Sequence, residues 1–371
     1  MPGGIVSPAL RTHWPRHTHG HWLCAYAAEP PCLSQQPKGG MNQFFSHRFG
    51  IEIEFTGITR RKAAVIVADY FNIPDPDTYV GDSDSYYVYA PDDRVWKFVY
   101  DGSIRRERKE NGRRLHANTN YSVEMVSPIL NYYEDIRMLQ DIVRRLRKAG
   151  GYANSSCGIH VHLDGVGHTP RSILNFINIV ASRNDLFYKA LQIKTDRMGY
   201  CKKMDAYLVE HANSIRPLTF DRLKKVWYEG YSGSINSHSH NSRYHFLNLH
   251  SFFTGNHTVE LRGFNSELHA GKVRAYVVFA LALNHQALTQ KYARYRKVQE
   301  ENEKFAMRVY LNRIGLIGEE FKSCRKHLYE HLNGNAAWRY GSKENCRSHR
   351  KKKKSNEEIT EGVIIDEGIG S

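Results

Sequence analysis

The stretch GIEIEF at residues 50–55 decides the fold of this chain, because two glutamates, Glu52 and Glu54, alternate in it with apolar residues. Successive side chains of a strand point to opposite faces, so the pattern predicts a strand with one apolar face and one face that carries both carboxylates. Carboxylates this close raise each other's pKa unless a cation or a set of donors compensates. A half-exposed strand with a solvated acidic face is the alternative interpretation of this motif taken alone.

Three further stretches repeat this alternation of polar and apolar residues. They are SVEMVSP at residues 122–128, CGIHVHL at residues 157–163 and HTVELRGF at residues 257–264, which carry Glu124, His160 with His162, and Glu260 with Arg262. Taken singly, each has an ordinary interpretation as an edge residue, a satisfied histidine or a cross-strand ion pair. Together, they predict about five carboxylate or imidazole ligands around one cavity. Such a set suits Mg²⁺ or Mn²⁺, and the absence of cysteine from the candidate ligands argues against structural zinc.

The order of the predicted elements favours an α+β fold. Strands are predicted at 48–55, 86–89, 95–100, 121–126, 158–163, 244–249 and 258–264, and helices at 60–71, 133–149, from about 170, and after 271. Strands and helices alternate without the glycine-rich turns of βαβ units, so we expect a curved, mainly antiparallel sheet backed by helices. Residues 195–241 are expected to be rich in loops. The adjoining histidines His238, His240 and His245 indicate either a mobile lid over the site or a metal-binding tract.

Composition divides the chain into three parts. Residues 1–44, rich in Pro, Gly, His and Ser, are expected to be a disordered extension, and residues 333–371, with a basic run followed by an acidic stretch, a disordered charged tail. Residues 45–332 are expected to form the catalytic domain. No apolar run approaches the roughly 20 residues that span a bilayer. With no secretory signal either, we expect a cytoplasmic protein without a membrane partner.

The formal net charge of +15 indicates a polyanionic or phosphate-bearing partner. The excess is spread through the central part of the chain, which suits phosphate-bearing substrates as well as nucleic acid. The 23 tyrosines are at least as well explained by packing as by base stacking, so the sequence argues against a nucleic-acid partner. It does not indicate an oligomeric state.

The ordered set of motifs resembles the amidoligase family, whose members are related to glutamine synthetase and glutamate–cysteine ligase. The resemblance covers most of residues 48–290. It rests on GIEIE at 50–54, DGS at 101–103, EMVSP at 124–128, CGIHVH at 157–162 and TVELR at 258–262. No single motif is specific, but the ordered set is. It implies a glutamine-synthetase-like catalytic sheet and two divalent cations.

The resemblance also implies roles for the acidic residues. Glu52, His160 and Glu260 would hold the cation on the nucleotide side. Glu54 and Glu124 would hold the other cation.

Further roles follow for the remaining polar residues. By resemblance, His162 would contact an ATP phosphate and Arg262 would bind the substrate carboxylate. Glutamine synthetase has an arginine where this chain has Thr258. Phosphate neutralisation would then fall to another basic residue, with Arg243 as a candidate. Asp101 is a candidate general base by position, although a plain turn aspartate is an equal alternative.

The implied function is that of an ATP-dependent carboxylate–amine ligase, which uses Mg²⁺ or Mn²⁺ and forms an amide or peptide-type bond through an acyl phosphate. Its partners would be a small-molecule or peptide carboxylate and an amine. Two alternatives stay open. The fold could be catalytically silent and act as a basic nucleic-acid-binding or regulatory module, or the same carboxylates could serve a metal-dependent hydrolase that consumes no ATP.

Overall fold

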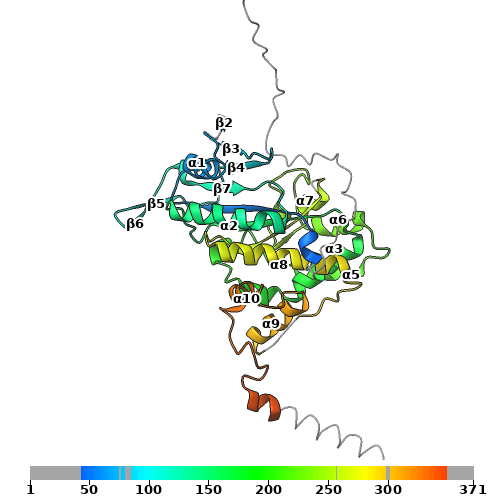
Figure 1. Cartoon of the computed structure of the whole chain (residues 1–371). Coiled ribbons are helices and arrows are strands. Elements are labelled where there is room, and N and C mark those ends of the chain that lie inside the picture. The colour runs from blue at the N-terminus through cyan, green and yellow to red at the C-terminus, as the bar shows by residue number, and fades with distance from the viewer. Residues whose placement is uncertain (1–42, 75–76, 80–84, 256, 298–300, 349–371) are drawn as a thin grey trace, which may run out of the picture. The chain divides into compact units, whose positions relative to one another are not determined.

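An eight-stranded antiparallel sheet, in the order β2-β3-β4-β7-β1-β8-β10-β9, is the frame of the protein (Figure 1). The computed structural model describes residues 43–74, 77–79, 85–255, 257–297 and 301–348. The strands of this sheet are β1 (Phe49–Phe55), β2 (Asp77–Tyr79), β3 (Ser85–Tyr89), β4 (Val95–Val99), β7 (Val123–Val126), β8 (Gly158–Asp164), β9 (Leu247–Asn248) and β10 (Thr258–Asn265). A separate hairpin pairs β5 (Glu107–Glu110) with β6 (Arg113–His116).

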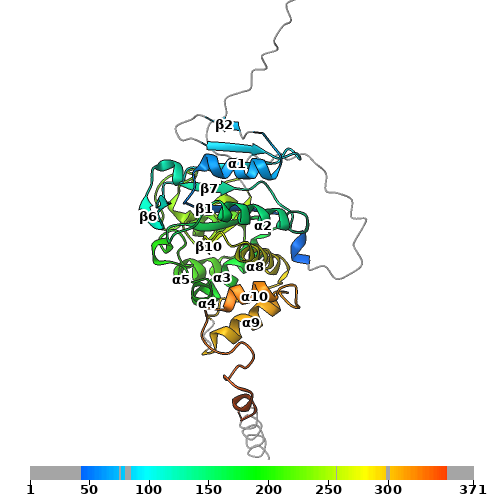
Figure 2. The same cartoon turned by 60° about the vertical axis from the view of Figure 1, so that its left-hand side comes forward.

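Helices cover the apolar face of the sheet. The longer helices are α1 (Arg60–Tyr70), α2 (Tyr132–Lys148), α3 (Pro170–Ser182), α8 (Ala270–Thr289) and α9 (Glu303–Arg313); the shorter ones are α4 (Asn184–Ala190), α5 (Ala206–Ser214), α6 (Phe220–Tyr228), α7 (His250–Phe253) and α10 (Lys322–Tyr329). α1 packs on β3 and β4, α8 packs on β8, and α2 joins α1 to α8. Figures 1 and 2 both place α9 and α10 beyond α8 as seen from the sheet. The predicted α+β class, with a mainly antiparallel sheet backed by helices, is confirmed, while its glutamine-synthetase-like character stays a prediction.

The sheet and helices join through one hydrophobic core. Ile51, Ile53 and Phe55 of β1 are fully buried on the helix side, opposite apolar residues of β7 and β8. α2 buries one face, including Leu139, Val143 and neighbours at helical spacing, and ends before Gly150, whose φ of 101° suits only glycine. The apolar side of each strand therefore meets helices, which leaves the polar side of β1, β7, β8 and β10 for the site.

Several elements within the central part were missed, among them two helices and a hairpin. Residues 195–241, expected to be rich in loops, contain α5 and α6, which begin at the N-caps Asp205 and Thr219. Each helix is only nine residues long; α5 has a weak periodic pattern, whereas α6 buries Leu223 and Trp227 at helical spacing but is too short to stand out from its surroundings. The β5–β6 hairpin turns at Asn111 and Gly112, both with positive φ, which is the usual two-residue hairpin turn.

The described ends refine the expected boundaries. Phe44, the last residue of the expected N-terminal extension, and Phe45, the first of the expected catalytic domain, are both buried, and the Phe45 ring stacks on Tyr132. Asn302 donates hydrogen bonds to the carbonyls of Trp338 and Arg339, so part of the expected tail contacts the start of α9. The rest of both segments, residues 1–42 and 349–371, lies outside the described residues.

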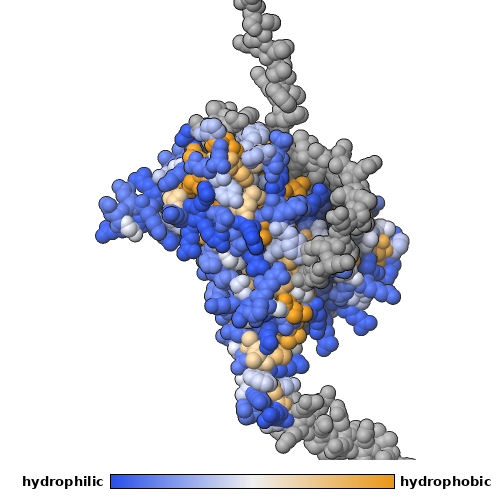
Figure 3. Space-filling view, in the orientation of Figure 1, coloured by the Kyte–Doolittle hydropathy of each residue, from blue (hydrophilic) through white to orange (hydrophobic). Residues whose placement is uncertain are grey.

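The surface seen in Figure 3 is mostly hydrophilic, and the β5–β6 hairpin projects from it, while apolar side chains gather over α1. None of the described helices is long and apolar enough to cross a membrane.

Candidate metal centre

Backbone pairing brings the polar residues of four strands together on the face of the sheet away from the core. Three cross-strand pairs result, Glu52 with His160, Glu54 with Glu124, and Glu260 with His162. All six side chains are at least half-buried. The alternation that the sequence predicts for these strands is thus the observed one, and it gathers the candidate ligands in one place.

Glu52 lies at the centre of this cluster. Its Oε2 is 2.9 Å from Nδ1 of His160, and its Oε1 is 3.0 Å from Nε2 of His162. The carboxylate of Glu260 faces the same imidazoles, with Oε1 3.6 Å from His160 Nδ1 and 4.0 Å from His162 Nε2. Two carboxylates and two imidazoles therefore form the first part of the site.

Glu260 is fixed by two donors. Nη1 of Arg262 donates to its Oε1 at 2.5 Å, and Nδ2 of Asn248 donates to its Oε2 at 2.6 Å. Asn248 lies on the edge strand β9 and pairs directly with Glu260 on β10, the strand that also carries Arg262. Glu260 is 1% exposed. A buried carboxylate with a charged and a neutral donor is held in one orientation.

The second part of the site is acidic. Carboxylate oxygens of Glu54, Asp101 and Glu124 lie within 4.8 Å of one another. The backbone N–H of Gly158 donates to Glu54 Oε2 at 2.6 Å, and that of Ser103 donates to Asp101 Oδ1 at 2.6 Å. The DGS turn that follows β4 therefore aims Asp101 at the two glutamates.

The two histidines differ in electrostatic environment. Burial, reinforced by the charge of Arg262, lowers the pKa of His160 to about 4. Burial also acts to lower the pKa of His162, but the charges of Glu52 and Glu260 outweigh it and raise that pKa above its ordinary value. His160 is therefore neutral near pH 7, with a nitrogen lone pair for a cation, while His162 more readily keeps its second proton.

The glutamates divide in the same way. Burial and the charge of Asp101 raise the pKa of Glu54 to about 7, and burial with the charges of Glu52 and Asp101 raises that of Glu124 well above its usual range. Burial opposes the ionisation of Glu260, but Arg262 and His162 bring its pKa to about 2. The Glu54–Glu124 half is thus a buried group of carboxylates with too little positive charge around it.

Comparison with known proteins shows the family of the chain. Residues 46–284, well over half of its length, match the family model described as "Putative amidoligase enzyme". The chain belongs to this amidoligase family. No curated protein matches it. Among solved structures, a bifunctional glutathione synthetase from Pasteurella multocida is similar at 11% identity and a TM-score of 0.32, over 78% of this chain and 47% of that one. The chain thus spans about half the length of that protein, and a TM-score this low does not establish a shared fold.

The donor set of this amidoligase-family chain fits divalent cations of the hard type. Three groups offer ligand atoms within 4.8 Å: Glu52–Glu124–His160, Glu52–His162–Glu260 and Glu54–Asp101–Glu124. They contain carboxylate oxygens and imidazole nitrogens only, which suits Mg²⁺ or Mn²⁺ better than thiophilic ions. A cation would also offset the repulsion that raises the pKa of Glu54 and Glu124. Cation binding itself stays a prediction, as do the roles given to each residue.

The remaining predicted residues lie around the cluster in different ways. Arg243, in the short 3-10 helix Asn241–Arg243, donates to the carbonyl oxygen of His238 at 3.1 Å. Burial and Arg243 lower the pKa of His238, while Glu52 and Glu260 act on it from the cluster. Arg243 is thus near the site but paired within its own segment. No group of three possible ligands in the described chain includes the histidines of residues 238–245, so nothing supports the metal-tract interpretation.

Three supporting residues escaped the sequence reasoning. Asn248 orients Glu260, Gly158 binds Glu54, and the fully buried Arg197 donates to the carbonyls of Arg262 and Phe264 at 2.8 and 2.6 Å. Arg197 fills the space where Gly158 has no side chain, since a Cβ there would lie 2.3 Å from its guanidinium. Asn248 lies in a predicted strand at the alternating position, which was a usable signal. Arg197 ends the short 3-10 helix Thr195–Arg197, and nothing in its local sequence marks it.

A bulge in β10 aims Arg262. The register with β8 shifts between Leu261 and Phe264, so Arg262 and Gly263 share one position of the partner strand. A Cβ on Gly263 would lie 2.0 Å from the ring of Phe246, which is fully buried and has no room to move. The bulge therefore requires glycine at residue 263.

Gly263→Ala is expected to lower the free energy of unfolding by about 1–3 kcal/mol, as overpacking of a core does. Gly199→Ala is the matched control, because nothing lies within 4 Å of a Cβ at that position. Urea denaturation of both variants measures the effect. Equal stability of Gly263→Ala and the unchanged protein would contradict the described bulge.

Proposed function

We propose that this amidoligase-family protein is an ATP-dependent carboxylate–amine ligase that uses two divalent cations, Mg²⁺ or Mn²⁺, and forms an amide or peptide-type bond through an acyl phosphate. The observation that carries the proposal is the buried cluster of Glu52, Glu54, Glu124, His160 and Glu260 on one face of the sheet. Bound there, the cations would neutralise phosphate oxygens during transfer. The five residues are their proposed ligands.

The two histidines support a division of labour. Neutral His160 is the proposed cation ligand beside Glu52. His162, whose pKa the neighbouring carboxylates raise, is the proposed donor to a phosphate oxygen of ATP. Environments that push the pKa values of two like groups apart are typical of sites with distinct acid and base roles. Arg243 is the proposed second contact of the phosphates, once released from His238.

The proposed chemistry runs in two balanced steps. A carboxylate oxygen of the substrate attacks the γ-phosphorus of ATP, and ADP leaves. The amine nitrogen then attacks the acyl carbon, loses a proton to a base and expels inorganic phosphate. Arg262 is the proposed partner of the substrate carboxylate, since its planar fork suits a carboxylate. Asp101 is the proposed base, because its carboxylate enters the acidic half of the site.

The proposal predicts ATP hydrolysis that requires both a carboxylate and an amine. Arrays of amino acids or short peptides paired with amines, with ADP release and mass spectrometry of the product as readouts, test it. Glu260→Gln is expected to lower the rate by at least about 100-fold, comparable to removal of one preorganised catalytic group. Product formation without ATP would favour the hydrolase instead, and unchanged turnover of Glu260→Gln would exclude this site.

One observation favours the nucleic-acid alternative. The exposed β5–β6 hairpin and the residues that lead into it carry six arginines and lysines against two glutamates between residues 105 and 116. Basic β-ribbons are one form of nucleic-acid-binding element. If the hairpin binds DNA or RNA, the affinity must fall steeply with salt concentration. An affinity that is absent, or independent of salt, removes this alternative.

A further inference from the structure

A pocket of about 300 Å³, which we call the arginine pocket, lies where the ends of α3, α8 and α9 meet. Its polar lining consists of three arginines, Arg183, Arg294 and Arg313, and two carboxamides, Gln286 and Gln290. None of these residues belongs to the acidic cluster on the sheet. The pocket is therefore separate from the candidate metal centre in both location and charge.

Among the described residues, the three arginines have no acidic partner. Arg183 is half-buried, with its guanidinium 4.2 Å from the centre of the Tyr310 ring and a long 3.4 Å hydrogen bond to the carbonyl oxygen of Ile179. Arg294 and Arg313 are exposed. Across the residues that the structure describes, no carboxylate oxygen lies within 4.0 Å of any of the three guanidiniums. Three like charges around one hollow repel one another unless an anion joins them.

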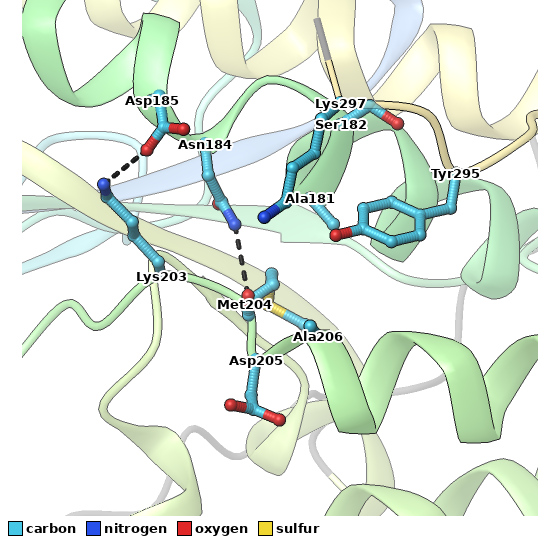
Figure 4. Close-up of a pocket in the computed structure, with 10 residues that line it drawn as sticks. All are labelled: Ala181, Ser182, Asn184, Asp185, Lys203, Met204, Asp205, Ala206, Tyr295 and Lys297. Carbon is cyan, nitrogen blue, oxygen red and sulfur yellow. Dashed lines mark hydrogen bonds and ion pairs between the residues drawn. The ribbon is translucent and has the colours of Figure 1, made fainter.

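The neighbouring pocket shows the contrasting arrangement. It measures about 220 Å³. The chain segment of residues 293–297 lines both this pocket and the arginine pocket. Lys203 there points at Asp185, with Nζ 2.5 Å from Oδ1, and Asp205 supplies a second carboxylate (Figure 4). The cations of that pocket thus have counter-charges from the protein itself. Those of the arginine pocket have none among the described side chains.

Helix ends explain only part of the arginine charge. The C-termini of α3, α8 and α9 each carry a partial charge of about −0.5, which three arginines would offset. The partial charges of the three helix ends sum to roughly −1.5, whereas the three arginines carry +3, so the pocket keeps a net positive charge. An ordinary role as helix-end counter-charges therefore leaves about half of the positive charge unexplained.

The two carboxamides of the pocket keep donor capacity. Oε1 of Gln286 accepts from the Tyr310 hydroxyl at 2.8 Å, and Oε1 of Gln290 accepts from Nε2 of Gln286 at 2.9 Å. Nε2 of Gln290 donates to the carbonyl oxygen of Tyr292 at 2.9 Å. Each amide oxygen is thus engaged, while each amide nitrogen keeps a second N–H. The pocket offers donors and positive charge together, which is the chemistry of an oxyanion site.

We propose that the arginine pocket binds a small polyvalent oxyanion, a phosphate ester or a polycarboxylate, at a site distinct from the metal centre. The volume lies at the lower end of the range of about 300–1,000 Å³ for small-molecule sites, so an organic anion fits better than a single ion. Arg183 and the two glutamines form its inner wall. Arg294 and Arg313 close around it from the exposed side.

Calorimetric titration of the full chain with pyrophosphate and with citrate, in EDTA and at matched ionic strength, tests the proposal. Binding by the unchanged protein is expected to weaken at least about tenfold in the double variant Arg294→Gln/Arg313→Gln, because each lost charged hydrogen bond costs that much or more. Both side chains are exposed, so the variant should fold. Lys297→Gln, which removes a cation from the neighbouring pocket, is the matched control and is expected to bind within about twofold of the unchanged protein.

The outcomes separate cleanly. Stronger binding of pyrophosphate identifies a phosphate ester as the class of ligand, and stronger binding of citrate identifies a polycarboxylate. No binding of either anion, or equal binding by the unchanged protein and the double variant, overturns the proposal. An equal loss in Lys297→Gln would also overturn it, because that result indicates diffuse attraction to a basic surface.

Discussion

Glu52→Gln is expected to weaken Mn²⁺ binding at least about 100-fold and to abolish turnover. Loss of an outer-shell partner of a metal typically costs about 10–100-fold in affinity. Glu52 belongs to two of the three ligand groups and contacts both histidines, so its loss should exceed that range. Titration followed by the electron paramagnetic resonance of free Mn²⁺ measures the effect directly.

The matched control for this prediction is Glu110→Gln. Glu110 is an exposed glutamate of β5, paired with Arg108, and the same charge is removed far from the ligand groups. Its Mn²⁺ affinity should equal that of the unchanged protein. Equal loss in both variants would show that only overall charge matters, and retained binding in Glu52→Gln would place the cations elsewhere.

Stabilisation by Mg²⁺ or Mn²⁺ is expected to increase from pH 6 to pH 8. The folded pKa of Glu54 is about 7, above the ordinary value of 4.5, and that of Glu124 is also raised. A raised carboxyl pKa gives stability that is present below the unfolded pKa and lost as the pH rises through the folded pKa. The cation-free protein should therefore weaken toward pH 8, whereas cation binding, which needs the ionised carboxylates, should strengthen.

The size of this pH effect follows from the number of protons displaced. Each proton that the cation releases changes the affinity by up to tenfold per pH unit, or about 1.4 kcal/mol. Thermal unfolding with and without Mg²⁺ at pH 6, 7 and 8 tests the trend. Glu54→Gln should flatten it, because the variant removes a titrating carboxylate and one ligand. A shift of the melting temperature by Mg²⁺ that is the same at all three values would contradict the assignment of Glu54 and Glu124.

The alternation of polar and apolar residues made the centre of the fold predictable. In β1, β7, β8 and β10, burial of one face dictates which residues of the same strand share the other, so pairs such as Glu52 with Glu54 and His160 with His162 could be grouped from spacing alone. Long amphipathic helices such as α2 were predictable for the same reason. Spacing does not show which strands lie side by side, and there the resemblance to a family implied that the four strands share one site.

Features set by tertiary contact could not be predicted in this way. Arg197 acts through carbonyls more than 60 positions away in the sequence, and the bulge at Gly263 depends on the ring of Phe246. The pairing of Arg262 with Glu260 on the same strand also changes its expected environment, since its guanidinium already has an acidic partner. Short helices such as α5 bury too few residues to leave a periodic signal.

A crystal structure of the protein soaked with Mn²⁺ and a non-hydrolysable ATP analogue tests the central claim most directly. We predict two anomalous peaks on the polar face of the sheet, one among Glu52, His160 and Glu260 and one between Glu54 and Glu124, each roughly 2.0–2.3 Å from its ligand atoms. The phosphates should lie beside His162. Mn²⁺ bound only outside this cluster, or nucleotide bound without it, would contradict the account.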